Sequence, residues 1–145
     1  MTTVEETLSL NITQEIFVRA TMATTFEALL EQMGPGNERA DGSAMPMKIE
    51  AWPGGRWYRD LGGDNGHFWG HVQAIRRPDL MEICGPLFAS SPLVSNLQYR
   101  LKEKEGGTLI ELRHTAMGFI PEDHRKGVHT GWASLLKRVQ QAAEK

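Results

Sequence analysis

The sequence VHTGWASLLKRVQQAA, residues 128–143, decides the fold. Six of its apolar residues recur in steps of four, three, one, three and four, which places them on one stripe of an α-helix. The stripe consists of Val128, Trp132, Leu135, Leu136, Val139 and Ala143. A helix this one-sided needs a broad apolar surface to lie on, and nearly all of the preceding chain has strand periodicity. We therefore predict a long C-terminal helix held by a curved antiparallel sheet, with an apolar pocket between them.

Seven segments before this helix carry strand signals. The first, residues 8–20, alternates apolar and polar positions, and Gln14 interrupts its apolar face, so a bulge or twist is possible there. The other six are residues 44–52, 56–60, 67–76, 80–85, 92–103 and 108–117. A short helix is predicted after the first strand, because residues 24–27 fit a capping box and Gly34-Pro35-Gly36 ends the helix. The pattern is α+β.

Size and composition indicate an ordinary globular protein. The 145 residues, 40% of them hydrophobic and 23% charged, fit one domain over residues 1–145, with residues 1–6 as a flexible tail. The net charge of −2 argues against a nucleic-acid partner or an anionic membrane. A lone Cys84 cannot form an internal disulfide, and neither a signal peptide nor a membrane span is recognisable. We expect a soluble, cytoplasmic protein.

Several local patterns, taken in order, resemble the SRPBCC (START-like) superfamily, and in particular the homologues of the activator of the heat-shock protein ninety ATPase. The patterns are Pro53-Gly54-Gly55-Arg56; Trp69-Gly70-His71-Val72 followed by Ile75 and Pro78; Gly107-Thr108 through Leu112, His114 and Gly118-Phe119; and Gly131-Trp132 with Leu135-Leu136. The N-terminal alternation ending in Val18 and Ala20, followed by Phe26 and Ala28-Leu29, matches as well. The resemblance covers roughly residues 8 to 143.

The resemblance implies a helix-grip fold, in which six or seven antiparallel strands wrap round the last helix and leave a hydrophobic cavity. Two departures lie near the expected cavity entrance: extra length between His114 and Gly118-Phe119, and no tryptophan in residues 34–43. The shape of the pocket therefore does not carry over from the family. The family name does not imply chaperone activity for this chain.

Strand parity and the resemblance together predict the residues that line the cavity. The long strand 67–76 is ambiguous, because the face with Val72 and Ala74 is more apolar, and the resemblance turns Trp69, His71 and Gln73 inward instead. The predicted ligand-binding residues are Met47, Ile49, Trp57, Trp69, His71, Gln73, Ile83, Tyr99, Ile110, Leu112, His114, Trp132, Leu135, Leu136 and Val139. Most would be apolar or aromatic walls, and His71, Gln73, Tyr99 and His114 would orient a ligand.

No catalytic residue, metal site or cofactor is predicted. His67 and His71 share one face of a strand but lie too far apart along it to bind one metal ion directly. The glycine-rich residues 62–66 join two strands and include no Lys, so they form a turn rather than a phosphate loop. Small residues at Gly127 and Gly131 suggest a close approach of the helix to the sheet, or a kink.

Three functions remain open. The first is binding of a small hydrophobic or amphipathic molecule, such as a lipid, without catalysis. The second is an enzyme on the same scaffold, of cyclase, hydrolase or dehydratase type, with His114 or His71 as acid–base. The third is a module that binds a partner protein through an exposed patch, at residues 88–93 or at the helical insertion. The identity of the ligand and the oligomeric state do not follow from the sequence.

Overall fold

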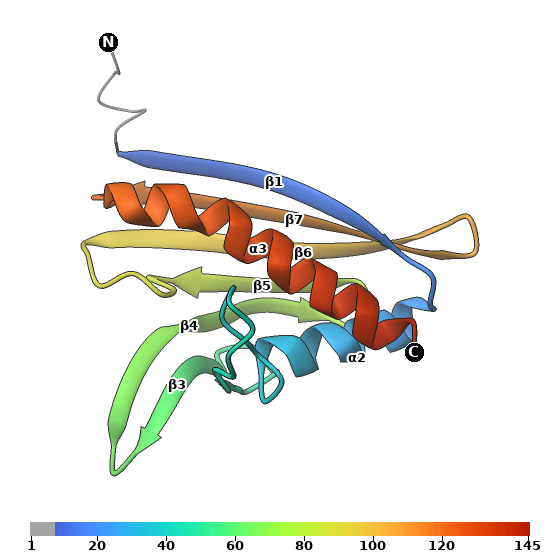
Figure 1. Cartoon of the computed structure of the whole chain (residues 1–145), viewed down its shortest axis with the longest axis horizontal. Helices are drawn as coiled ribbons and strands as arrows, with labels where there is room; N and C mark the ends of the chain where they lie inside the picture. Colours follow the sequence, from blue (N-terminus) through green and yellow to red (C-terminus); the bar gives the residue numbers. More distant parts are fainter. Residues whose placement is uncertain (1–7) are drawn as a thin grey trace.

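A seven-stranded antiparallel sheet and two helices make up the computed structural model, which describes residues 8–145 (Figure 1). The predicted tail, residues 1–6, lies outside the described residues. The strands are β1 (Ser9–Val18), β2 (Lys48–Ile49), β3 (Arg56–Gly62), β4 (Asn65–Arg76), β5 (Leu80–Gly85), β6 (Leu93–Lys104) and β7 (Gly107–Gly118), in the sheet order β1-β7-β6-β5-β4-β3-β2. Helix α2 (Met22–Met33) follows β1, and α3 (Glu122–Ala143) ends the chain and lies across the sheet. The predicted helix-grip fold is confirmed.

Helix α3 buries the predicted stripe. Its buried residues are Val128, Trp132, Leu135, Leu136, Val139 and Ala143. The helix begins at Glu122, earlier than the predicted Val128, because its first turn is stabilised by acidic residues and not by an apolar stripe. Glu122 and Asp123 place negative charge next to the N-terminal end of the helix dipole, and Pro121 stands at the N-cap.

Strands β6 and β7 form the regular centre of the sheet. Leu97 pairs with His114, Tyr99 with Leu112 and Leu101 with Ile110, and all six side chains are buried. The alternation predicted for these two strands is therefore confirmed. They supply a continuous apolar floor beneath the second half of α3.

Strand β4 contradicts the predicted orientation of two residues. Its register shifts against β3 near Trp69 and against β5 between Val72 and Ala74. Each extra residue reverses the faces of the strand locally, so Trp69 and Val72 are both buried while His71 and Gln73 are exposed. The prediction that His71 and Gln73 face the helix is wrong.

Three smaller expectations about the N-terminal half also need correction. Strand β2 has only two residues, because Met45 N–H and Met47 N–H donate to carbonyls of the loop after α2 instead of a sheet partner. Helix α2 is capped by Thr21, whose side chain accepts from Thr24 N–H, rather than by Thr24. Strand β1 has no bulge at Gln14, whose side-chain amide donates to the His129 carbonyl on α3.

Candidate functional site

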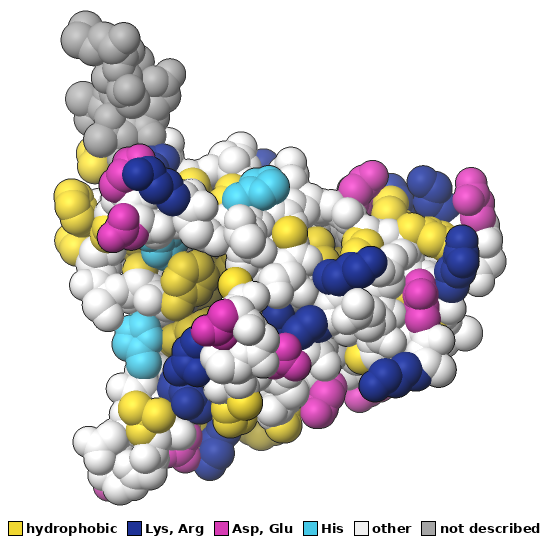
Figure 2. Space-filling view, in the orientation of Figure 1, with side chains coloured by type: hydrophobic (Ala, Val, Ile, Leu, Met, Phe, Trp, Pro, Cys, Tyr) yellow, Lys and Arg dark blue, Asp and Glu magenta, His cyan; other side chains and the backbone are white. Residues whose placement is uncertain are grey.

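An apolar cavity of about 280 Å³ lies between residues 127–138 of α3, the loop after α2 and the bend of β3 and β4. It is open to solvent. The lining residues are Asn37, Glu38, Arg39, Ala40, Met45, Trp57, Trp69, Phe88, Gly127, Val128, Gly131, Trp132, Leu135 and Arg138. Figure 2 shows hydrophobic side chains in a hollow of this face, next to histidine and charged groups. Beyond Arg138, the buried residues Val139 and Ala143 belong to the core and line no part of the cavity, so the cavity occupies one end of the predicted interface.

Two glycines give the helix wall its shape. Gly127 and Gly131 lie one turn apart on α3 and both line the cavity. A Cβ built on either residue meets no atom within 4 Å. The expectation that these glycines allow close approach to the sheet is therefore wrong: they leave space open where side chains would otherwise stand.

Aromatic rings form the opposite wall and the rim. Trp57 and Trp69 meet edge to face with ring centroids 4.9 Å apart, and Phe88 lies 5.6 Å from Trp69 and 5.9 Å from Trp132. Phe88 also stacks on His124 at 4.6 Å. Phe88, which sequence reasoning assigned to a partner-binding patch, thus belongs to the cavity wall. Flat, polarisable walls of this kind suit a planar or cyclic ligand.

A half-buried arginine stands at one end of the cavity. Arg138 donates from Nε to Gln32 Oε1 at 3.2 Å, from Nη1 to Ser134 Oγ at 2.9 Å and from Nη2 to Asn37 Oδ1 at 3.2 Å. Burial lowers the pKa of Arg138, and the charge of Glu38 opposes that shift. Sequence reasoning missed Arg138, because its position on α3 lies beside the apolar stripe rather than on it.

His114 is enclosed in the core beside the cavity. Its side chain is fully buried, its Nδ1 accepts from Trp132 Nε1–H at 2.9 Å, and its Nε2 lies 2.9 Å from Ser95 Oγ. Because Nδ1 accepts, the ring proton of the neutral imidazole is on Nε2 and is donated to Ser95. Burial lowers the pKa of His114 to about 4, with a smaller contribution from His124. His114 therefore positions Trp132 as a neutral hydrogen-bond acceptor.

Four of the predicted ligand-binding residues line the cavity: Trp57, Trp69, Trp132 and Leu135. Nine others lie away from it, in the core or packed against it: Met47, Ile49, Ile83, Tyr99, Ile110, Leu112, His114, Leu136 and Val139. The remaining two, His71 and Gln73, are on the outer face of the sheet. Tyr99 is buried with no hydrogen bond to its hydroxyl, and this burial raises its pKa. Sequence reasoning missed the loop after α2, whose polar residues show no periodicity.

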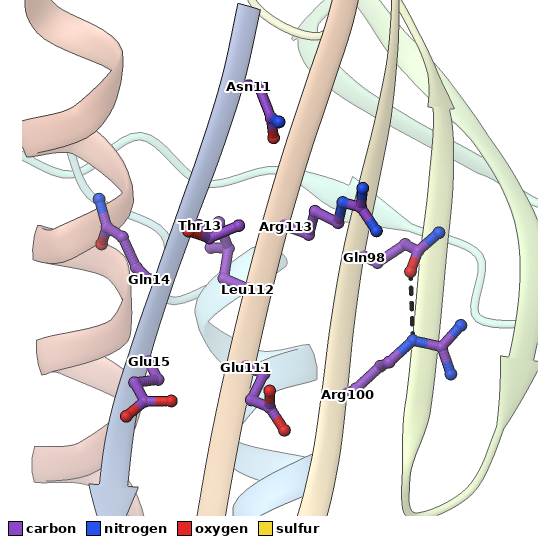
Figure 3. A pocket seen from close by; sticks show the side chains of 9 residues that line it. All are labelled: Asn11, Thr13, Gln14, Glu15, Gln98, Arg100, Glu111, Leu112 and Arg113. Atoms are coloured by element: carbon purple, nitrogen blue, oxygen red, sulfur yellow. Dashed lines mark hydrogen bonds between the residues drawn. The ribbon is translucent and has the colours of Figure 1, made fainter.

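A second, larger depression of about 640 Å³ lies on the outer face of β1, β7 and β6. Its walls are mainly polar, with Arg100 donating to Gln98 Oε1 at 3.2 Å (Figure 3). Glu111 lies opposite Arg100 on the neighbouring strand, and Glu15 lies opposite Glu111 on the other side. A polar surface that carries both acidic and basic side chains offers little apolar area for a ligand. The apolar cavity next to α3 is therefore the candidate site.

Comparison with known proteins places the chain in a family. The model of the family described as Activator of Hsp90 ATPase homolog 1-like protein matches residues 19–144. The chain belongs to this family. No curated protein matches this member of the Activator of Hsp90 ATPase homolog 1-like family in sequence. Within residues 8–145, no helix is long and apolar enough to cross a membrane.

Several solved structures share its fold. The crystal structure of Ara h 8.0201 aligns with a TM-score of 0.69 at 13% identity, over 93% of this chain and 97% of that one. An uncharacterised protein from Rhizobium leguminosarum gives a TM-score of 0.70 at 17% identity, over 94% and 95%. The di-domain ARO/CYC StfQ from the steffimycin biosynthetic pathway gives 0.68 at 12% identity, over 94% and 51%. These likenesses establish the fold alone.

Proposed function

We propose that this protein binds a small amphipathic molecule, with a flat or cyclic apolar body, in the cavity beside α3. The observation that carries the proposal is the pair of helical glycines, Gly127 and Gly131, opposite an aromatic wall. Glycine within a helix costs roughly 0.5–1 kcal/mol relative to alanine. Neither glycine is required by a packing contact. Their effect is to keep open a space that a ligand can fill.

The size and chemistry of the cavity support a compact ligand. Its volume of about 280 Å³ is close to the lower end of the range of about 300–1,000 Å³ for ligand sites. Burial of apolar ligand surface contributes roughly 25 cal/mol per Å² before ordering costs, so an aromatic ring system gains most from these walls.

Acid–base catalysis by the two predicted histidines is not supported. Both ring nitrogens of His114 are engaged with Trp132 and Ser95, and the residue is not part of the cavity wall. His71 is exposed on the other side of the sheet, where its ring lies 4.8 Å from that of Phe68. Neither group can reach a molecule bound beside α3.

The test fills the space that the glycines leave. In Gly131→Leu the new side chain would occupy the cavity, so we expect binding of any ligand found in a panel of cyclic and aromatic compounds to be lost. Binding is measured by isothermal titration calorimetry and by the shift in melting temperature.

Ala133→Leu provides the matched control, because Ala133 is exposed on the same helix outside the cavity. It should leave ligand binding unchanged. A ligand that binds Gly131→Leu as tightly as the unmodified protein would show that the cavity is not the binding site.

A further inference from the structure

The charged residues around the cavity differ in burial and in hydrogen bonding. Arg39, Arg138 and Glu38 are the charged residues among those that line it. Arg39 is exposed and its Nη1 is committed to its own loop, where it donates to the Ala44 carbonyl at 3.0 Å. Arg138 is half-buried beside the apolar walls. Arg138 is therefore the half-buried cation that a bound molecule meets in the cavity, and Glu38 is the half-buried anion.

Arg138 has donors to spare. A guanidinium carries five N–H groups, and the three hydrogen bonds of Arg138 use one each on Nε, Nη1 and Nη2. Within residues 8–145, the second N–H of Nη1 and that of Nη2 have no acceptor. Two N–H groups on Nη1 and Nη2 are what a carboxylate needs for a two-point contact.

The acceptors around Arg138 are all neutral. Gln32, Ser134 and Asn37 supply amide or hydroxyl oxygens, and none of the ion pairs found in residues 8–145 includes Arg138. A cation that is partly removed from water without a directly bonded counterion is costly. Glu38 lines the same cavity but makes no ion pair with Arg138 within the described chain. An anion entering the cavity would relieve this imbalance.

We propose that the ligand is a small organic monocarboxylate, whose carboxylate pairs with Arg138 while its apolar body lies between the tryptophans and α3. This inference rests on the proposed function and adds the chemical class of the ligand. A single free guanidinium with a carboxylate nearby favours one negative charge over two, because Glu38 repels a dianion such as a phosphate monoester. The aromatic walls favour a ring over a chain as the apolar body.

Matched pairs of compounds separate the charge from the shape. Each acid is compared with its primary amide on three frameworks: benzoic acid with benzamide, 2-naphthoic acid with 2-naphthamide, and octanoic acid with octanamide. Calorimetry at pH 7 measures the dissociation constant of each. On at least one framework we expect the acid to bind at least about tenfold more tightly than the amide, which corresponds to one charge-assisted contact.

Three variants assign the preference to its source. Arg138→Gln should abolish the preference for the acid while leaving amide binding in place, and Arg138→Lys should retain part of it. Glu38→Gln should strengthen acid binding. Lys137→Gln is the control. Lys137 directly precedes Arg138 on α3, is exposed, and donates a hydrogen bond to Gln140 outside the cavity.

The outcomes distinguish the two proposals. Equal binding of acid and amide to the unmodified protein overturns the carboxylate inference and leaves the cavity as the site of a neutral ligand. An acid preference that survives in Arg138→Gln overturns the role of Arg138. If no acid and no amide binds, both the ligand class and the proposed function fail. If Arg138→Gln does not fold, Arg138→Lys still tests the role of Arg138, because it keeps a cation on α3 and should retain only part of the preference for the acid.

Discussion

His114 makes the acid stability of this protein depend on one buried ring. Its neutral form accepts from Trp132 and donates to Ser95, and burial lowers its pKa from 6.5 to about 4. The unfolded chain therefore binds a proton on this histidine in a range of pH where the folded protein does not. Stability from this source is complete above about pH 7, decreases as the pH falls through 6.5, and is fully lost near pH 4.

We expect His114→Gln to flatten the pH dependence of unfolding. Between pH 7 and pH 5 the unmodified protein should lose about 2 kcal/mol more unfolding free energy than the variant, since a glutamine does not titrate. Urea denaturation at several pH values measures the difference. His129→Gln is the control, because it removes a histidine that is exposed and lies outside the buried contacts of His114 with Trp132 and Ser95. Parallel pH profiles for His114→Gln and the unmodified protein would contradict the assignment.

At the level of single residues, the sequence was informative where strands are regular. The burial of His114, Leu112 and Ile110 followed from alternation on β7, which pairs with β6 without a register shift. The orientation of His71 and Gln73 did not, because each of the two bulges in β4 adds a residue and reverses the faces. Gly70 lies beside the first bulge and is the kind of residue that marks one, but no such residue marks the second bulge at Gln73.

Helix α3 combines two stretches with different purposes. Residues 127–138 carry the two glycines and border the cavity, whereas Val139 and Ala143 continue the apolar stripe into the core. The stripe was readable from the sequence. The start of the helix was not, because residues 122–127 are polar apart from Gly127 and provide no apolar periodicity.

We expect Gly127→Ala and Gly131→Ala each to stabilise the protein by roughly 0.5–1 kcal/mol, because both sites have open space for a methyl group and alanine favours the helix. Gly131→Ala should also weaken ligand binding, since its methyl group enters the cavity. Thermal and urea unfolding measure the first effect.

We expect Gly107→Ala to destabilise the protein, because its Cβ would lie 2.6 Å from the Val18 carbonyl oxygen. A loss of stability in Gly127→Ala or Gly131→Ala would mean that the helix needs these glycines for packing after all.

On the scale of the whole molecule, the protein divides into a packed region and an open one. Tyr99, Leu112 and Val139 are buried in the core, and none of them lines the cavity. The open region is assembled from segments far apart in the chain, including residues 37–45, Phe88 and Arg138. The fold class could be predicted because local periodicity specifies strands and helices. The position and charge of the cavity could not be predicted, because they depend on how irregular loops pack against α3.

The placement of the tryptophans allows intrinsic fluorescence to report on ligand binding in the cavity. Trp57, Trp69 and Trp132 line the cavity, whereas Trp52 is 58% exposed in the turn before β3 and is not part of the wall. In Trp52→Phe, every remaining indole would therefore report on the cavity. We expect the variant to lose its red-shifted emission, and its remaining fluorescence to change when a ligand enters. A ligand that binds by calorimetry yet leaves that emission untouched must sit elsewhere on the molecule.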